Sequence, residues 1–135
     1  MIINKTRKTI VSSHERLGQS FLSQSLGLMF RPRENLLMVF TKERRVSLQM
    51  WFVFYPITVL VVNKDKVVVE IKENFWPFTF WTSREKGKYV LELGSGQGKG
   101  KAMVGKVEVG DRLEIKLKGP ELSKILLSSS LWRGV

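Results

Sequence analysis

Cysteine is missing from this chain of 135 residues, and histidine occurs once. The lack of cysteine excludes disulfide bonds, zinc–thiolate sites and thiol nucleophiles, and it fits a reducing cytoplasm, where we expect the protein. The single histidine, His14, has no nucleophile-elbow sequence near it. Because metal ligands are so few, we expect no metal ion and no cofactor. A carboxylate pair such as Glu70 and Glu73 remains a candidate for the catalysis of glycoside hydrolysis. Two acids that solvate the edge of a strand explain the pair better, so an enzyme is the less favoured interpretation.

Long apolar segments are scarce as well. Residues 46–62 carry no charge and approach the roughly 18 residues that make a membrane-span candidate. Pro56 interrupts this stretch, and its residues are largely β-branched or aromatic. We therefore interpret it as two buried strands joined at Pro56 and expect no membrane span. No apolar segment follows the basic residues near the N-terminus, so we expect no secretory signal.

Strand patterns fill most of the chain. Residues 88–93 and 112–118 alternate between apolar and polar side chains, as half-buried strands do. Residues 57–62 are apolar on both faces, which is typical of a central strand. The polar turn 63–66 joins them to a partner strand that begins at Val67, so a hairpin is predicted here.

A second hairpin is predicted from residues 36–40 and 46–50, turned at 42–44, with charged outer residues that protect an edge from unwanted pairing. Helix is expected in two places. One is a short helix over 20–26, and the other is a tail from Pro120 that packs on the domain, dimerises or frays. We predict an all-β protein, with one β-sandwich domain over 1–119 and a tail over 120–135.

Charge is strongly unbalanced, because 23 Lys and Arg residues face 12 acids, for a net charge of +11. Such a balance attracts polyanions, among them nucleic acids and anionic lipids. The alternative is a solvated cationic surface without a particular partner. Basic residues occur along the whole chain, so their positions do not decide between the two.

Five aromatic rings lie within residues 75–81. On an alternating strand they cannot all face one core, so some are expected to be exposed or to line a cleft. There they could stack on sugars or bases, or anchor a protein partner. The alternative, favoured by the large apolar area of these rings, is a loop that closes the open end of the sandwich.

The glycine run at 94–101 invites a phosphate-binding interpretation, because backbone amides in such loops can cradle anions. Its spacing matches neither the Walker motif nor the dinucleotide motif, so a flexible connection between strands is the better interpretation. Asp111 follows Gly110 just before the alternating stretch 112–118. Turn chemistry alone explains this pair.

Several blocks occur together in one order and spacing: Gly-Leu-Met-Phe-Arg at 27–31, Leu-Leu-Met-Val-Phe at 36–40, Met50, Pro56, Lys-Tyr-Val-Leu-Glu-Leu at 88–93 and Gly-Asp at 110–111. In these blocks the chain resembles the domain of unknown function 192 family, from about residue 20 to residue 115. The resemblance implies a compact β-sandwich of jelly-roll type. It implies no biochemical role, because none is assigned to the family.

The chain departs from the family pattern at its centre. The family usually has Lys-Asn-Thr after the methionine and Pro-Leu-Asp a few residues later. Here Trp51, Phe52 and Val53 follow Met50, and Thr58 takes the place of the aspartate. If the polar residues form a site in the family, this chain has lost most of it.

We therefore expect a non-catalytic binding or accessory protein with an aromatic-lined, basic-rimmed cleft for an anionic, carbohydrate-like or peptide ligand. Arg31 would supply charge, while Trp76 and Trp81 would supply stacking. The candidate ligand-binding residues are Arg31, Met50, Trp76, Trp81, Tyr89 and Asp111. A nucleic-acid-binding module driven by net charge is the main alternative, and a homo-oligomer that uses the tail from Pro120 to Trp132 is the third.

Overall fold

A computed structural model describes residues 1–18, 34–94 and 106–117, and every regular element in these ranges is a β-strand. The all-β prediction is therefore confirmed. The predicted helix at 20–26 and the tail from 120 lie outside the described residues. The strands are β1 (Ile2–Asn4), β2 (Thr9–Ser12), β3 (Arg16–Gly18), β4 (Asn35–Gln49), β5 (Ile57–Val62), β6 (Val68–Phe75), β7 (Phe80–Leu93) and β8 (Leu113–Ile115).

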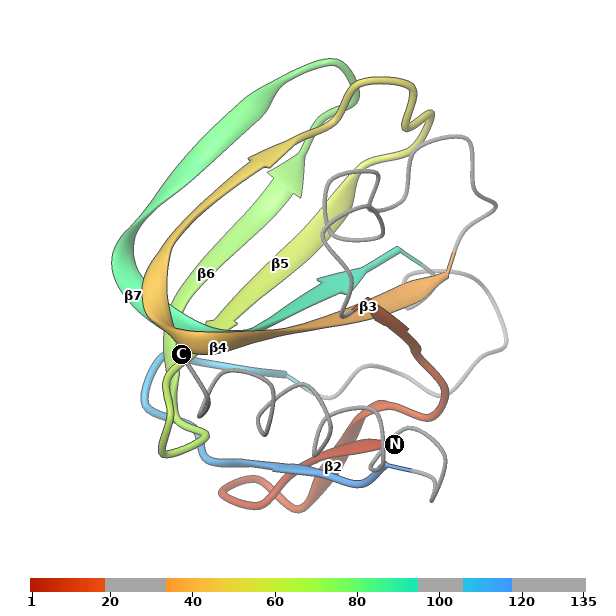
Figure 1. The fold of residues 1–135 in the computed structure, drawn as a ribbon. Coiled ribbons are helices and arrows are strands. Elements are labelled where there is room, and N and C mark those ends of the chain that lie inside the picture. Colours follow the sequence, from red (N-terminus) through yellow and green to blue (C-terminus); the bar gives the residue numbers. More distant parts are fainter. Residues whose placement is uncertain (19–33, 95–105, 118–135) are drawn as a thin grey trace.

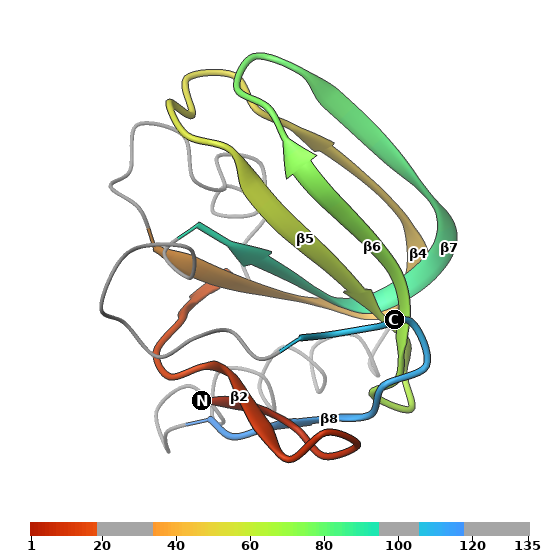
Figure 2. The ribbon, with the colours of Figure 1, turned by 180° about the vertical axis from the view of Figure 1, so that it is seen from behind.

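The strands form two sheets that pack face to face as a β-sandwich (Figures 1 and 2). The smaller sheet has the order β2-β1-β8, and the larger has the order β3-β4-β7-β5-β6. β3 runs parallel to β4, whereas the other neighbours in the larger sheet are antiparallel. The predicted sandwich is therefore confirmed.

β4 and β7 form a long ribbon that curls over the rest of the larger sheet (Figure 1). Their pairing runs from Asn35 opposite Leu93 to Gln49 opposite Phe80. Since β5 pairs with residues 89–93 of β7, the other half of the ribbon is left to bend across β5 and β6. The backbone amides of residues 84 and 85 donate to Glu70 Oε1 on β6 at 2.7 and 2.9 Å, which holds the bent half in place.

The bend depends on close backbone packing at Gly87. A Cβ atom there would lie 2.5 Å from Cγ1 of Val61 on β5, so any larger residue would require the Val61 side chain or one of the two strands to move. Glycine in a strand often marks such an approach.

The predicted hairpin of residues 36–40 and 46–50 is wrong, because residues 36–40 and 46–49 belong to one strand, β4. The charged residues at 42–44, which we assigned to a turn, lie where the register between β4 and β7 is irregular. Both segments pair with β7 instead of with each other, and nothing in the local pattern of β4 identifies a partner so distant in sequence.

The predicted hairpin from residue 57 onwards is confirmed as β5 and β6. Asn63 organises its turn, since its Oδ1 accepts from the backbone amides of Asp65 and Val67, each at 3.0 Å. Lys66 has a left-handed backbone with a φ of 63°. Tight turns favour such side-chain-to-backbone bonds from asparagine.

Two hydrophobic cores lie on opposite faces of β5. Val59 and Val61 face the space inside the curl, where they pack with Met38, Met50 and Phe75. The other core joins the two sheets and contains the alternate residues of β5, β7 and β8. It includes the predicted inward sets, and its members on these three strands are Leu60, Val62, Tyr89, Leu91, Leu93, Leu113 and Ile115. Burying each such side chain stabilises the fold by about 1.5–3 kcal/mol.

Candidate functional site

The structure describes five of the six predicted site residues, and these five lie in three places. Met50, Trp76 and Trp81 lie at the end of the sandwich where β4 leads into β5 and β6 leads into β7. Tyr89 faces the core between the sheets, and Asp111 lies in the turn before β8. Arg31 is outside the described residues.

Met50 joins the two connections at this end. Its backbone amide donates to the Thr79 carbonyl at 2.7 Å, and its carbonyl accepts from the Phe78 amide at 2.8 Å. The Met50 side chain is buried in the core inside the curl, and Trp81 packs against the same core. Trp81 also contacts Phe75 edge to face, with ring centroids 6.3 Å apart. Met50 and Trp81 therefore support this end from beneath.

Six aromatic side chains project from these two connections into solvent. Between 45% and 76% of each is exposed, which is unusual for such large apolar groups. We call this set the aromatic end, and its members are Trp51, Phe52, Phe54, Trp76, Phe78 and Phe80. Residues 75–81 thus fulfil both of our alternatives, because Phe75 and Trp81 close the core while the remaining rings face outward.

Phe78 lies at the centre of the aromatic end. Its ring meets those of Trp51, Phe52 and Phe54 edge to face, with centroid separations of 6.2, 6.0 and 5.8 Å. These contacts hold the two connections together as one apolar surface. The rings are steeply inclined to one another, with interplanar angles of 64° to 74°, so these four do not present a flat stacking platform.

Two members of the aromatic end have a left-handed backbone: φ is 58° at Phe52 and 61° at Phe78. A bulky side chain rarely adopts this conformation, which costs of order 1–3 kcal/mol. Glycine or asparagine would suit both positions better. Phenylalanine at both positions therefore needs a reason other than local backbone preference.

We did not predict Trp51, Phe52 and Phe54 as site residues. We assigned them to buried strands because residues 46–62 carry no charge, and that assignment is wrong for these three, since β4 ends at Gln49 and β5 begins at Ile57. Three aromatic residues within four positions just before Pro56 were the available signal. A proline cannot donate a hydrogen bond to a neighbouring strand, so residues next to it are less suited to a buried central strand.

Tyr89 is half-buried on β7, and burial raises the pKa of its phenol. Asp111 is buried and makes internal contacts. Its Oδ2 accepts from Asn4 Nδ2 at 2.8 Å, from Arg7 Nε at 2.7 Å and from the Glu108 amide at 2.9 Å. Desolvation raises the pKa of Asp111, but these hydrogen bonds and the Arg7 charge outweigh it and hold the pKa below its usual value. The bond from the Glu108 amide is the local contact of the predicted turn, and Gly110 has the left-handed φ of 98° that such a turn uses. The bonds from Asn4 and Arg7 join this turn to the N-terminal residues.

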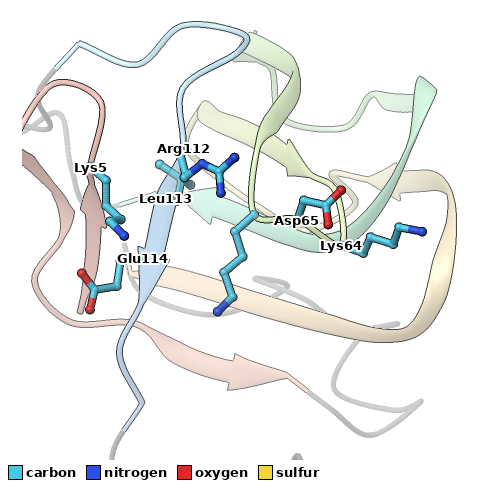
Figure 3. A pocket seen from close by; sticks show the side chains of 7 residues that line it. Lys5, Lys64, Asp65, Arg112, Leu113 and Glu114 are labelled. Carbon is cyan, nitrogen blue, oxygen red and sulfur yellow. The ribbon is translucent and has the colours of Figure 1, made fainter.

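A hollow of about 360 Å³ lies at the opposite end of β5 from the aromatic end (Figure 3). We call it the basic hollow, and its lining is Lys5, Lys64, Asp65, Lys66, Arg112, Leu113 and Glu114. Hydrogen bonds between backbone groups join its walls, since the Leu113 amide donates to the Lys66 carbonyl at 2.8 Å. Within the described ranges, no carboxylate forms an ion pair with any of its four cationic side chains. Like charges held together in this way can receive an anion.

A wider hollow of about 580 Å³ lies over the bent ribbon, where Arg45, Arg84 and Lys86 share the lining with Glu43 and Glu85. Neither of the two hollows is lined by an aromatic side chain. Among the described residues, the aromatic end and the basic hollow are therefore separate surfaces. The described part of the chain contains no group of three acidic or histidine side chains placed to hold a metal. The same described residues include no helix of the length and apolar character needed to cross a membrane.

Known proteins are similar in sequence to this chain. The family model DUF192, described as an uncharacterised ACR, matches residues 2–115. A UPF0127 protein of Pyrococcus furiosus is 33% identical over 116 residues, which cover 84% of this chain and 96% of that protein. A UPF0127 protein of Thermococcus sibiricus is 29% identical over 96 residues, covering 68% of this chain and 62% of that protein. The family resemblance predicted from the sequence is confirmed.

Two crystal structures share the fold, each with a TM-score of 0.63. One is described as a candidate transcription regulator from Sinorhizobium meliloti; it is 32% identical, over 74% of this chain and 79% of that chain. The other is a protein of unknown function from Novosphingobium aromaticivorans, 23% identical over 75% of this chain and 74% of that chain. The second likeness concerns the fold alone.

Proposed function

The chain belongs to the DUF192 family, and we propose that it is a non-catalytic binding protein whose ligand-contacting surface is the aromatic end. One observation carries this proposal: six aromatic side chains are exposed at one end of the sandwich, and three of them pack around a fourth, Phe78. Trp76 would contact the ligand directly, while Met50 and Trp81 would hold the surface in place. A carbohydrate-like, peptide or anionic ligand would gain apolar contact area from such a surface.

Backbone strain supports a binding role. Phe52 and Phe78 keep bulky side chains at left-handed positions where the fold itself would prefer smaller residues. Strain of this kind tends to be retained at functional sites, where the rest of the structure supports it. Their rings also touch, so the two strained positions together shape the centre of the surface.

The test is a screen of the purified protein against a glycan array, with neutral and sulfated sugars, and a random peptide library. The same screen is made with the double variant Phe54→Ser and Phe80→Ser, two of the most exposed rings. Ligands that the wild type retains and the variant loses by at least about tenfold would support the proposal. Equal retention by both proteins would contradict it.

The basic hollow favours a second candidate function, the binding of nucleic acid. Four cations and two acids line it, so its charge is positive on balance, and the net charge of the chain is +11. Lysine and arginine at such a surface release counterions when they neutralise phosphates. The description of the Sinorhizobium meliloti relative as a candidate transcription regulator agrees with this function.

Fluorescence anisotropy with a labelled oligonucleotide, measured over a series of salt concentrations, tests this second candidate. Lys64→Gln with Arg112→Gln should weaken binding and reduce the slope of log affinity against log salt by about one to two. Lys8→Gln with Lys72→Gln, which removes two charges outside the lining of the hollow, is the control. Equal loss in control and test variants would mean that charge acts without a site.

A further inference from the structure

We propose that the aromatic end docks on the surface of a lipid bilayer that carries anionic headgroups. This inference rests on the proposed function, since it names the partner of the same surface. It concerns peripheral attachment through side chains, with the β-sandwich remaining in water. The argument uses the shape of the aromatic end, its chemistry and the position of the nearest cations.

The aromatic end is built of the side chains that bilayer interfaces accept. Tryptophan and phenylalanine place large apolar area at the boundary between headgroups and acyl chains. Its two turns project from the end of the sandwich where the β4–β5 and β6–β7 connections meet (Figure 1). The edge-to-face packing around Phe78 makes a compact projection of inclined rings, which suits insertion among lipids better than stacking on a flat base or sugar.

Cations follow the aromatic end along the bent ribbon of β4 and β7. The segments 42–45 and 84–88 contain six Lys and Arg residues and two acids. We call the cations the basic collar, and they are Lys42, Arg44, Arg45, Arg84, Lys86 and Lys88. Three make side-chain contacts. Arg45 Nε donates to the Ser83 carbonyl at 3.1 Å, and Lys88 Nζ donates to the Thr41 carbonyl at 3.1 Å. The Arg44 guanidinium lies 5.3 Å from the centre of the Phe40 ring.

The spacing between aromatic end and collar fits a bilayer surface. Gln49 pairs with Phe80, whereas Arg45 pairs with Lys86, so the collar begins about four residues behind the tip. At roughly 3.3 Å per strand residue this is about 13 Å. Aromatic groups inserted by about 5–10 Å would bring the nearest members of the collar, Arg45 and Arg84, within about one Debye length of the phosphates. There each Lys or Arg adds attraction to anionic lipid.

Charge complementarity selects this occupant over an apolar groove on another protein. A groove would satisfy the rings alone, whereas an anionic bilayer satisfies the rings and the collar together. The charges of Lys72 and Glu73, which precede the β6–β7 connection, cancel each other and do not change the net positive charge near the aromatic end. Binding to a soluble protein partner is the alternative that the test must distinguish from binding to a bilayer.

The test is co-sedimentation with two kinds of vesicle. One contains phosphatidylcholine alone, and the other contains phosphatidylcholine with about 30% phosphatidylglycerol, whose anionic headgroups attract Lys and Arg. Circular dichroism first establishes that each variant folds. Wild-type protein should sediment with the mixed vesicles at low salt, and its tryptophan emission should shift to shorter wavelength. Phe54→Ser with Phe80→Ser should weaken this binding at least about tenfold. Val109→Ser, which removes a side chain that is 62% exposed in the turn before β8, should leave it unchanged.

A second pair of variants tests the collar. Arg84→Gln with Lys86→Gln should weaken binding to anionic vesicles about tenfold. Lys8→Gln with Lys116→Gln removes the same charge from the layer of the smaller sheet and should have a much smaller effect. Equal effects of the two pairs, or unchanged binding by the Phe54 and Phe80 variant, would show that net charge alone draws the protein to lipid and would overturn the proposal.

The two proposals fail differently. If the wild type ignores both vesicle types but retains glycans or peptides that the Phe54 and Phe80 variant loses, the bilayer is not the partner and the binding surface stands. If that variant matches the wild type against vesicles, glycans and peptides alike, the aromatic end is not a binding surface, and both proposals fall.

Discussion

Phe78 lies edge to face against Phe54, with ring centroids 5.8 Å apart, although the two residues belong to different connections between strands. Both rings are nevertheless exposed, to 45% at Phe78 and 67% at Phe54. Contacts that leave both partners largely in water contribute little to folding, because most of the apolar area stays hydrated. This pair therefore belongs to a surface and not to the core.

Replacing Phe78 by asparagine should separate the surface from the fold. The lost ring contacts cost about 0.5–1.5 kcal/mol each when buried and less here, while relief of the left-handed backbone returns about 1–3 kcal/mol. We expect the free energy of unfolding, measured with urea, to change by no more than about 1 kcal/mol. Phe52→Asn should behave alike.

The matched comparison is Phe75→Ala, since Phe75 is 2% exposed and packs in the core inside the curl. Loss of a buried phenylalanine costs about 3–5 kcal/mol. A comparable loss at Phe78 would show that its ring stabilises the fold and would weaken the argument from strain.

Glu92 should make stability depend on pH. Desolvation raises its pKa from 4.5 to about 7, although the Arg16 charge lowers it. Between these values the folded protein binds more protons than the unfolded chain, so the free energy of unfolding falls as pH rises and is lowest above about pH 7. The full effect is about 3 kcal/mol, at about 1.4 kcal/mol per pH unit.

Urea unfolding at pH 5 and pH 8 checks this expectation in the wild type and in Glu92→Gln. In the glutamine variant, the free energy of unfolding should differ little between pH 5 and pH 8. At pH 8 the variant should be more stable than the wild type. Glu85→Gln, an exposed acid on the same strand, removes equal charge and should retain the wild-type difference. If both variants follow the wild type, Glu92 does not titrate in this range.

Asp111→Asn should destabilise the turn before β8. The substitution removes the carboxylate that Arg7, Asn4 and the Glu108 amide share. Loss of a charge-assisted hydrogen bond at a buried position costs about 2 kcal/mol. Because the folded pKa lies below the usual value, this stability is present at neutral pH and is lost as pH falls. In thermal unfolding, the Tm of the variant should therefore lie below that of the wild type at neutral pH, and the difference in Tm should decrease as the pH falls.

Gly87→Ala should test the bend in β7. Its Cβ would lie 2.5 Å from Val61 Cγ1 and 3.4 Å from the Val62 carbonyl oxygen. Overpacking of this kind costs about 1–3 kcal/mol. Val61→Ala in the same chain should restore part of the loss by making room, and a purely additive double variant would argue against direct contact.

Much of the strand content follows from residue patterns. The alternation of 88–93 and of 112–118 identifies the residues that face the core between the sheets, because neighbouring side chains of a strand point to opposite faces. The apolar stretch 57–62 and the turn at Asn63 likewise predict the β5–β6 hairpin. In each case the signal lies within about ten residues, the range over which a local pattern can act.

The sequence by itself therefore determines an all-β sandwich of the DUF192 family and the presence of two aromatic-rich segments. Only the tertiary structure decides that β4 is one strand, since its partner β7 is remote in sequence. It also decides that Trp51, Phe52 and Phe54 are exposed and join Phe78, and that the cations of the basic hollow lie elsewhere. The physical reason is that exposure depends on what the rest of the chain places over a residue. An apolar run has the same composition whether it enters a core or ends on the surface.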